Sequence, residues 1–257
     1  MLKLTKRFLK RGLSATIFHG YGSFFPTPPE VLLVEKNWAQ LKTALAAVDL
    51  DTYEGYSQIW SFAPKSRLNV RKVGLLHPFD FILYTSLVLA LRDSIARSRL
   101  PSNRVFSYRT EGLPPNRLYG DTPSWKDFRT AATARLSDDS SGFVGVTDIA
   151  DFYPRIYQHR LVNALDAAIP PGMREYVRVL EKMLSRFAEG TSYGIPVGPP
   201  ASRLLGEAVL IDVDSTLMSF GIDFIRYVDD FVIFADTSTN AEYGIRALGE
   251  TLFSNHG

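Results

Sequence analysis

The sequence predicts a mixed α/β (α+β) fold in which a small antiparallel sheet is backed by helices. Two short apolar runs, 224–228 and 231–234, flank a pair of adjacent aspartates, as the strands of a hairpin flank its turn. A third β-rich run, 142–148, ends in an aspartate, and the segment closes at Pro154. Elsewhere apolar residues recur at helical spacing. Hydrophobic residues make up 46% of the 257 positions, which is enough for a core.

The remaining elements follow along the chain. Residues 1–12 are basic and are expected to form a solvated, partly frayed arm, with a basic amphipathic helix as the alternative. The helix at 78–99 is expected to be buried, because its faces are mostly apolar. Ser202 is expected to cap the helix that it begins. The expected helices are 29–48, 78–99, 158–169, 171–190, 202–221 and 240–257, and the expected loops are 113–124 and 192–202.

Composition excludes several classes of protein. The chain has no cysteine, so disulfides and thiolate metal sites are excluded. Its four histidines lack metal-ligand spacing, which argues against zinc. The longest apolar runs are too short to span a bilayer, and no signal peptide is expected.

Charge is distributed unevenly along the chain. Residues 1–110 carry 16 basic and 7 acidic residues, a net +9, whereas residues 111–257 carry 13 and 20, a net −7. A basic half joined to an acidic half favours a polyanion partner on one side and metal-binding carboxylates on the other. The alternative is accidental clustering.

Three aspartates are expected to meet at one edge of the sheet. Asp148 ends one strand, and Asp229 and Asp230 occupy a hairpin turn where a solvated turn would be the plainer interpretation. Three clustered carboxylates repel one another unless a cation is present. Hard cations such as Mg²⁺ take carboxylate oxygens, and two such ions about 4 Å apart support phosphoryl transfer.

Three segments resemble motifs A, B and C of reverse transcriptases, in that order. Residues 148–153 (DIADFY) resemble motif A, residues 194–202 (GIPVGPPAS) motif B, and residues 227–230 (YVDD) the motif C hairpin. A four-letter string recurs by chance, but three ordered motifs within 83 residues are far more specific. The resemblance covers roughly residues 65–257 and implies a right-hand polymerase core of fingers and palm.

The resemblance also implies residue roles. The catalytic residues would be Asp148, Asp229 and Asp230, and the metal site would comprise these three together with Ile149, holding two Mg²⁺ ions with Mn²⁺ as an alternative. The implied dNTP-binding residues are Asp151, Phe152, Tyr153, Gly198, Arg71 and Lys72. Within this set Asp151 would lie near the triphosphate, and Tyr153 would act as a steric gate against a ribose 2′-hydroxyl.

Each of these roles has a structural alternative. Tyr153 is either a gate, a core aromatic, or both. Asp151 is otherwise a solvated strand end, Gly198 an ordinary turn glycine, and Ser202 only a helix cap.

Basic residues upstream are weaker candidates. Arg67, Arg71 and Lys72 precede a strand-like VGLL segment, where basic residues of the fingers hold the triphosphate, and a solvated face is the alternative. Arg109 is weaker still. His77 is expected to cap a helix, and Tyr227 to pack beneath the turn.

Motif B departs from the usual family pattern, because Val197 stands where most reverse transcriptases have glutamine. The longer string IPVGPPASRLLGEA, with GLLHPFDFILYTSLV and NRVFSYR upstream, resembles the abortive-infection and unknown-group reverse transcriptases of bacteria. Those enzymes are linked to antiphage defence. Some polymerise without a template or prime from a protein side chain, and some form oligomers.

The resulting hypothesis is an RNA-directed DNA polymerase in the bacterial cytoplasm. Its partners would be dNTPs, RNA and DNA template and primer or a protein primer, and a homo-oligomer is a further option. Residues 1–64 would be an unrecognised extension, 65–141 the fingers and start of the palm, and 142–257 the palm, with helices in 157–190 partly in the fingers. No thumb or motif D lysine is expected in this chain. The rivals are an inactive palm that binds nucleic acid or a partner, and an RNA-synthesising palm enzyme, against which Tyr153 argues.

Overall fold

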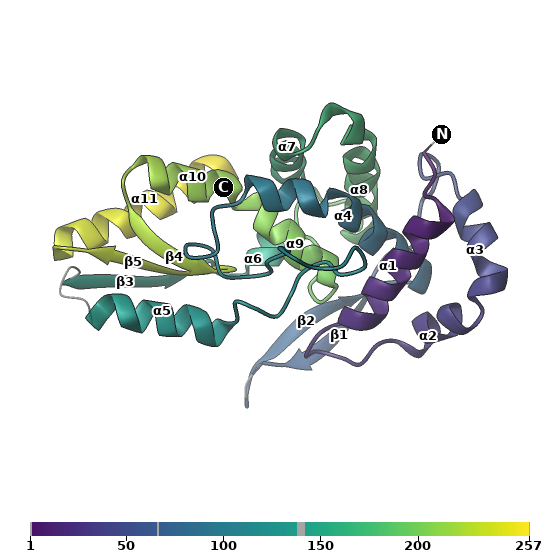
Figure 1. Ribbon diagram of the computed structural model, residues 1–257, viewed down its shortest axis with the longest axis horizontal. Coiled ribbons are helices and arrows are strands. Elements are labelled where there is room, and N and C mark those ends of the chain that lie inside the picture. Colours follow the sequence, from purple (N-terminus) through teal and green to yellow (C-terminus); the bar gives the residue numbers. More distant parts are fainter. Residues whose placement is uncertain (1, 66, 138–141, 257) are drawn as a thin grey trace.

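The computed structural model describes residues 2–65, 67–137 and 142–256 (Figure 1). It confirms the predicted mixed fold with a small antiparallel sheet backed by helices. The elements are α1 (Lys6–His19), α2 (Pro29–Lys36), α3 (Trp38–Ala47), β1 (Ile59–Pro64), β2 (Val70–Leu75), α4 (Pro78–Ser98), α5 (Trp125–Ser137), β3 (Phe143–Asp148), α6 (Phe152–Arg155), α7 (Gln158–Ala168), the 3₁₀ turn η1 (Pro171–Met173), α8 (Arg174–Phe187), α9 (Pro200–Val209), α10 (Ile211–Ser219), β4 (Asp223–Tyr227), β5 (Asp230–Ala235) and α11 (Ser238–His256).

The three-stranded sheet has the order β3-β5-β4, and both of its ladders are antiparallel. Side chains alternate between the two faces of a strand. Phe231 and Ile233 of β5 join the main core, whereas Val232 and Phe234 pack with Phe128 of α5. Helices therefore cover both faces, with α5 on one side and α10 and α11 on the other (Figure 1).

Helix α4 lies at the centre of the helical part, as its apolar sequence predicts. It contacts α1, α7, α8 and α9, and most of its residues are buried. The expectation of a frayed N-terminal arm was wrong, because α1 packs on α4 with Leu9 and Leu13 fully buried. Gly12 allows this contact, since a Cβ there would lie 1.8 Å from the Oγ atom of Ser86.

Several boundaries differ from the predictions. The expected helix at 29–48 is two helices that meet at Asn37, and the one at 202–221 begins at Pro200 and breaks at Leu210. Ser202 is therefore not the helix cap; its hydroxyl lies 2.9 Å from the Tyr84 hydroxyl in the core. The strand before motif A ends at Asp148, and Pro154 lies inside α6.

Other predictions hold, and two elements were missed. The loop at 113–124 and the helices at 158–169 and 171–190 are present, the latter entered through η1. Helix α5 and strand β1 had no sequence prediction. The expected boundary at residue 141 and the expected helix end at Gly257 lie outside the described residues. None of the helices in the described part of the chain is long and apolar enough to cross a membrane.

Candidate active site

The hairpin between β4 and β5 brings two aspartates to one end of the sheet. Tyr227 pairs with Asp230, so Val228 and Asp229 form a two-residue turn. Asp148 at the end of β3 is the register partner of Asp230, and the Ile149 amide donates a hydrogen bond of 3.1 Å to the Asp229 carbonyl. Directly opposed residues of antiparallel strands have Cβ atoms about 4.5–5.5 Å apart and share a face. The three predicted carboxylates thus come from neighbouring backbone positions.

The charges of these aspartates act on one another. Burial, followed by the charges of Asp229 and Asp148, raises the pKa of Asp230 to about 6. Burial also raises the pKa of Asp229, with a further contribution from Asp148. A cation would relieve this repulsion and restore the ionised state of both groups.

The donor chemistry of the cluster suits a hard cation, because three carboxylates supply only oxygen ligands. Among the described residues, however, no group of three or more histidine, cysteine, aspartate or glutamate side chains stands arranged to hold a metal ion. The carboxylates would therefore have to turn toward a common point to share one. Ile149, predicted with the metal site, donates its amide hydrogen to the Asp229 carbonyl, and its side chain packs against the main core.

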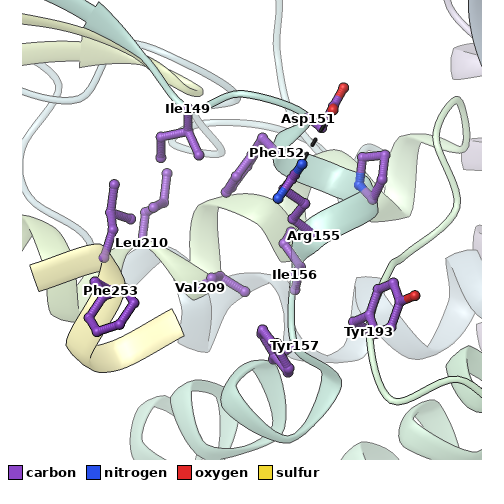
Figure 2. Close-up of a pocket in the computed structure, with 12 residues that line it drawn as sticks. Ile149, Asp151, Phe152, Arg155, Ile156, Tyr157, Tyr193, Val209, Leu210 and Phe253 are labelled. Atoms are coloured by element: carbon purple, nitrogen blue, oxygen red, sulfur yellow. Dashed lines mark ion pairs between the residues drawn. The ribbon is translucent and has the colours of Figure 1, made fainter. Parts of the chain in front are cut away.

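Asp151 and Phe152 follow strand β3 and lie at the start of α6. Asp151 has a left-handed backbone with φ 52°, and its exposed carboxylate forms an ion pair of 3.9 Å with Arg155 (Figure 2). Phe152 is only 6% exposed and packs in the main core. Both residues line an apolar pocket of about 760 Å³ beside α6.

Tyr153 places a buried phenol close to the aspartate cluster. Its hydroxyl is buried and has no hydrogen-bond partner among the described residues. Burial, with the charges of Tyr108, Glu207 and Asp229, raises its pKa well above the usual value, although Arg203 opposes the shift. The ring is thus part of the core and still within electrostatic reach of Asp229, which is compatible with both predicted roles.

Gly198 sits where the motif B loop meets strand β2. Its φ is +117°, and a Cβ there would lie 2.7 Å from Val73 Cγ1 and 3.0 Å from Tyr21 Cδ1. Next to it, the Gly74 amide donates to the Val197 carbonyl at 3.0 Å. The glycine therefore permits both an unusual backbone and a close contact between this loop and the β1–β2 hairpin.

The basic residues of the hairpin do not act together. Arg71 and Lys72 are within β2 rather than before it, so they point to opposite faces. The positive charge of Arg71 acts on Asp229, whereas the Lys72 ammonium lies 3.6 Å from the centre of the Trp60 ring. Arg67 is exposed in the loop between the strands. Of this predicted set, only Arg71 is linked to the aspartates.

Three other predicted residues have structural partners. Arg109 is buried, and its guanidinium donates to the Leu100 carbonyl and to Glu111, so it does not face the site. His77 caps α4, as predicted, by accepting a hydrogen bond of 3.4 Å from the Phe79 amide. Tyr227 packs against aromatic rings of α5 and of the segment before it.

Sequence reasoning missed a set of buried charges beneath the turn. Arg226 has no exposed surface and donates to Asp214 at 2.6 and 2.7 Å and to Glu207 at 2.9 Å. Arg99 donates to the same Glu207 oxygen at 2.6 Å. The available signal was charge in apolar surroundings, Glu207 and Asp214 within an otherwise apolar stretch and Arg226 within a strand.

Comparison with known proteins gave distant structural similarities. No protein-family profile matches the chain, and no curated protein matches it. A partial Cas6-RT-Cas1–Cas2 complex aligns at 20% identity and a TM-score of 0.45, covering 96% of this chain and 40% of that one. A second Cas6-RT-Cas1–Cas2 complex gives the same identity and TM-score and 25% coverage of its own chain.

Apo telomerase from Candida tropicalis, truncated from its C-terminal domain, aligns at 12% identity and a TM-score of 0.49, covering 87% of this chain and 52% of that one. This chain therefore spans at most about half the length of each of these structures. TM-scores below 0.5 are too low to assign it to a fold family.

Proposed function

We propose that this chain is an RNA-directed DNA polymerase that adds dNTPs to a 3′-hydroxyl at the end of the three-stranded sheet. The observation that carries the proposal is the register of β3 and β5, which sets Asp148 opposite Asp230 with Asp229 in the adjoining turn. The resemblance to motifs A, B and C, in the family order, gives these aspartates their role.

The reaction joins the 3′-oxygen to the α-phosphorus of the dNTP, breaks the bond to the β-phosphate and releases pyrophosphate and the hydroxyl proton. Two Mg²⁺ ions, with Mn²⁺ as a substitute, would activate the hydroxyl and neutralise the leaving group. In this chain Asp148, Asp229 and Asp230 would hold them. Arg71 would attract the triphosphate, a role supported by the action of its charge on Asp229. The protein thus contributes position and charge compensation.

Motif B supports a specialised form of this activity. Val197 takes the place of a glutamine that helps to form the pocket around the incoming sugar in most reverse transcriptases. The longer motif B string resembles that of antiphage-defence reverse transcriptases. We therefore infer a role in bacterial defence, with synthesis that is protein-primed, template-restricted or template-free rather than general copying.

The test is incorporation of labelled dNTPs or rNTPs with Mg²⁺, with and without an RNA template and a DNA primer. We expect dNTPs to be used in preference to rNTPs, and Asp229→Asn to abolish incorporation. Asp236→Asn, just beyond the far end of β5, is the matched control and should keep normal activity. A preference for rNTPs would indicate an RNA-synthesising enzyme. Nucleic-acid binding without incorporation would indicate an inactive palm. Long, faithful extension of an ordinary primer would exclude the specialised form.

A further inference from the structure

The turn that carries Asp229 rests on the buried charges described above. The side chains of Arg99, Glu207 and Arg226 are at most 1% exposed. Ser107 joins them, because its hydroxyl donates a hydrogen bond of 2.5 Å to Glu207 Oε1. The Arg99 guanidinium also donates to the Ser107 carbonyl at 2.6 Å, so this serine is fixed through both its side chain and its main chain.

Both main-chain groups of Val228 are bound by this cluster. Its amide donates to Ser107 Oγ at 3.0 Å, and its carbonyl accepts from Arg226 Nη1 at 3.0 Å. The Ser107 hydroxyl therefore acts as donor to Glu207 and as acceptor for Val228. Val228 is the residue immediately before Asp229, so its conformation sets the direction of the chain at the aspartate pair.

Val228 has a conformation that valine rarely adopts. Its φ is +57°, in the left-handed region, where a β-branched residue is a genuine outlier. Such a residue persists only where its surroundings impose the conformation. A two-residue hairpin turn requires a positive φ at its first central position, and the two hydrogen bonds to Ser107 and Arg226 fix the main chain of Val228 in this geometry.

Stability alone is a poor explanation for this cluster. Buried ion pairs often contribute little net stability, because desolvation of the charges offsets their attraction. The cluster instead fixes the orientation of its side chains, because Glu207 accepts hydrogen bonds from Arg99, Arg226 and Ser107 at once.

We propose that Ser107 is a positioning residue of the active site. Oriented by Glu207 and acting with Arg226, it holds Val228 in the left-handed conformation and so places Asp229 and Asp230 beside Asp148. This role in catalysis rests on the proposed polymerase function, whereas the structural part, that Ser107 holds the turn, does not.

The test removes one oxygen atom. Ser107→Ala should lower kcat about tenfold or more and change the KM for dNTP less than about twofold, because misplacement of reacting groups acts mainly on the chemical step. Hydrogen exchange of the Val228 amide, measured equally far below each variant's melting temperature, should speed up about tenfold. Ser86→Ala is the matched control, since Ser86 is also fully buried and its hydroxyl donates within α4, to the Ile82 carbonyl. It should change neither quantity by more than about twofold.

A double-mutant cycle with Val228→Gly separates positioning from simple stability. Glycine adopts positive φ without strain, so the turn should keep its shape with less help from Ser107. The loss of kcat caused by Ser107→Ala should therefore be at least about threefold smaller in the Val228→Gly background. An equal loss in both backgrounds, or a Val228 amide unaffected by Ser107→Ala, would overturn the proposal. If the wild-type protein incorporates no nucleotide, the polymerase proposal is wrong, and the amide exchange still decides whether Ser107 holds the turn.

Discussion

Asp230 begins the central strand of the sheet beside two other carboxylates, and its charge is poorly accommodated there. Its pKa is raised to about 6, so between pH 4 and pH 6 this carboxyl binds more protons in the folded protein than in the unfolded chain. The contribution of Asp230 to the free energy of unfolding should consequently fall as the pH rises through this window in metal-free buffer. Asp230→Asn removes the charge, so its melting temperature should exceed that of the wild type above pH 6. Below pH 4 the difference should disappear.

Asp236→Asn provides the control for this prediction. The pKa of Asp236 is lowered, chiefly by a hydrogen bond from the Asn240 side chain, so its charge is favourable in the folded state. Its replacement should give no gain at any pH. An Asp230→Asn protein that melts at or below the wild-type temperature at pH 8 would contradict the view that repulsion is uncompensated without metal.

Tyr153 gives a second prediction about a single residue, which concerns the choice between the deoxyribose and ribose sugars of the incoming nucleotide. Replacing it with valine should open space for a 2′-hydroxyl and raise the use of rNTPs relative to dNTPs. Replacing it with phenylalanine removes a buried hydroxyl that lacks a partner among the described residues. That change should leave the sugar preference intact and the melting temperature equal or higher. Competition between dNTPs and rNTPs measures both variants, and an unchanged ratio for the valine variant would show that Tyr153 serves only the core.

At the level of elements, the motif B loop contacts the β1–β2 hairpin at Gly198. Measuring the free energy of unfolding of variants can test this contact. Gly198→Ala would force a Cβ to within 2.7 Å of Val73 and would also strain the backbone at φ +117°. Gly190→Ala is the matched control, because φ is +83° there and nothing lies within 4 Å of the added Cβ. The control should cost about 1–2 kcal/mol of unfolding free energy from backbone strain, and Gly198→Ala should cost clearly more. Chemical denaturation measures both, and equal losses would show that the contact is not tight.

Sequence reasoning succeeded for elements whose pattern is local. The hairpin around Asp229 and the strand ending at Asp148 have β-rich runs bounded by clear signals, and the buried helix α4 has apolar faces throughout. It failed where tertiary contacts decide. The apolar residues of α1 are buried because this helix packs on α4, and the local sequence does not reveal that contact. Nothing in the local sequence required the helix breaks at Asn37 and Leu210.

The same difference between local pattern and tertiary contact decides what could be predicted of the candidate site. The aspartates could be placed together because strand ends and a turn bring them to one edge. The cluster of Ser107, Glu207 and Arg226 could not be foreseen, because its members are distant in sequence and their pairing depends on the packed fold. Arg71 and Lys72 were grouped by adjacency in sequence, whereas a strand sends neighbouring side chains to opposite faces.

At the scale of the whole molecule, the uneven charge predicts how the protein holds nucleic acid. Exposed basic residues gather on the β1–β2 hairpin, at Lys65, Arg67, Arg71 and Lys72, while residues 111–257 carry a net −7. We expect weak binding of an RNA–DNA duplex, with affinity that falls steeply as salt increases. Because Arg71 and Lys72 point to opposite faces of β2, the four cannot all contact one duplex, and about two to three phosphate contacts would give a slope of roughly −2 to −3 in a plot of log affinity against log salt.

Fluorescence anisotropy over a range of salt concentrations tests this prediction. Arg67→Ala should make the slope shallower by about 1, because it removes one phosphate contact. Lys10→Ala is the control, since Lys10 lies on α1 and pairs with Glu35. Tight binding that salt does not weaken would exclude an electrostatic hold through the hairpin.

The position of β3 in the sheet also bears on the order of events when the chain folds. Tyr227 and Asp230 meet across a two-residue turn, and hairpins of this kind form within about 1–10 μs. Asp148 lies 82 positions before Asp230, so its strand can join only after a long stretch of chain has been brought together. Contacts of such high sequence separation form slowly. The aspartate pair of the hairpin should therefore exist before its third member arrives, and the centre becomes complete only when β3 docks.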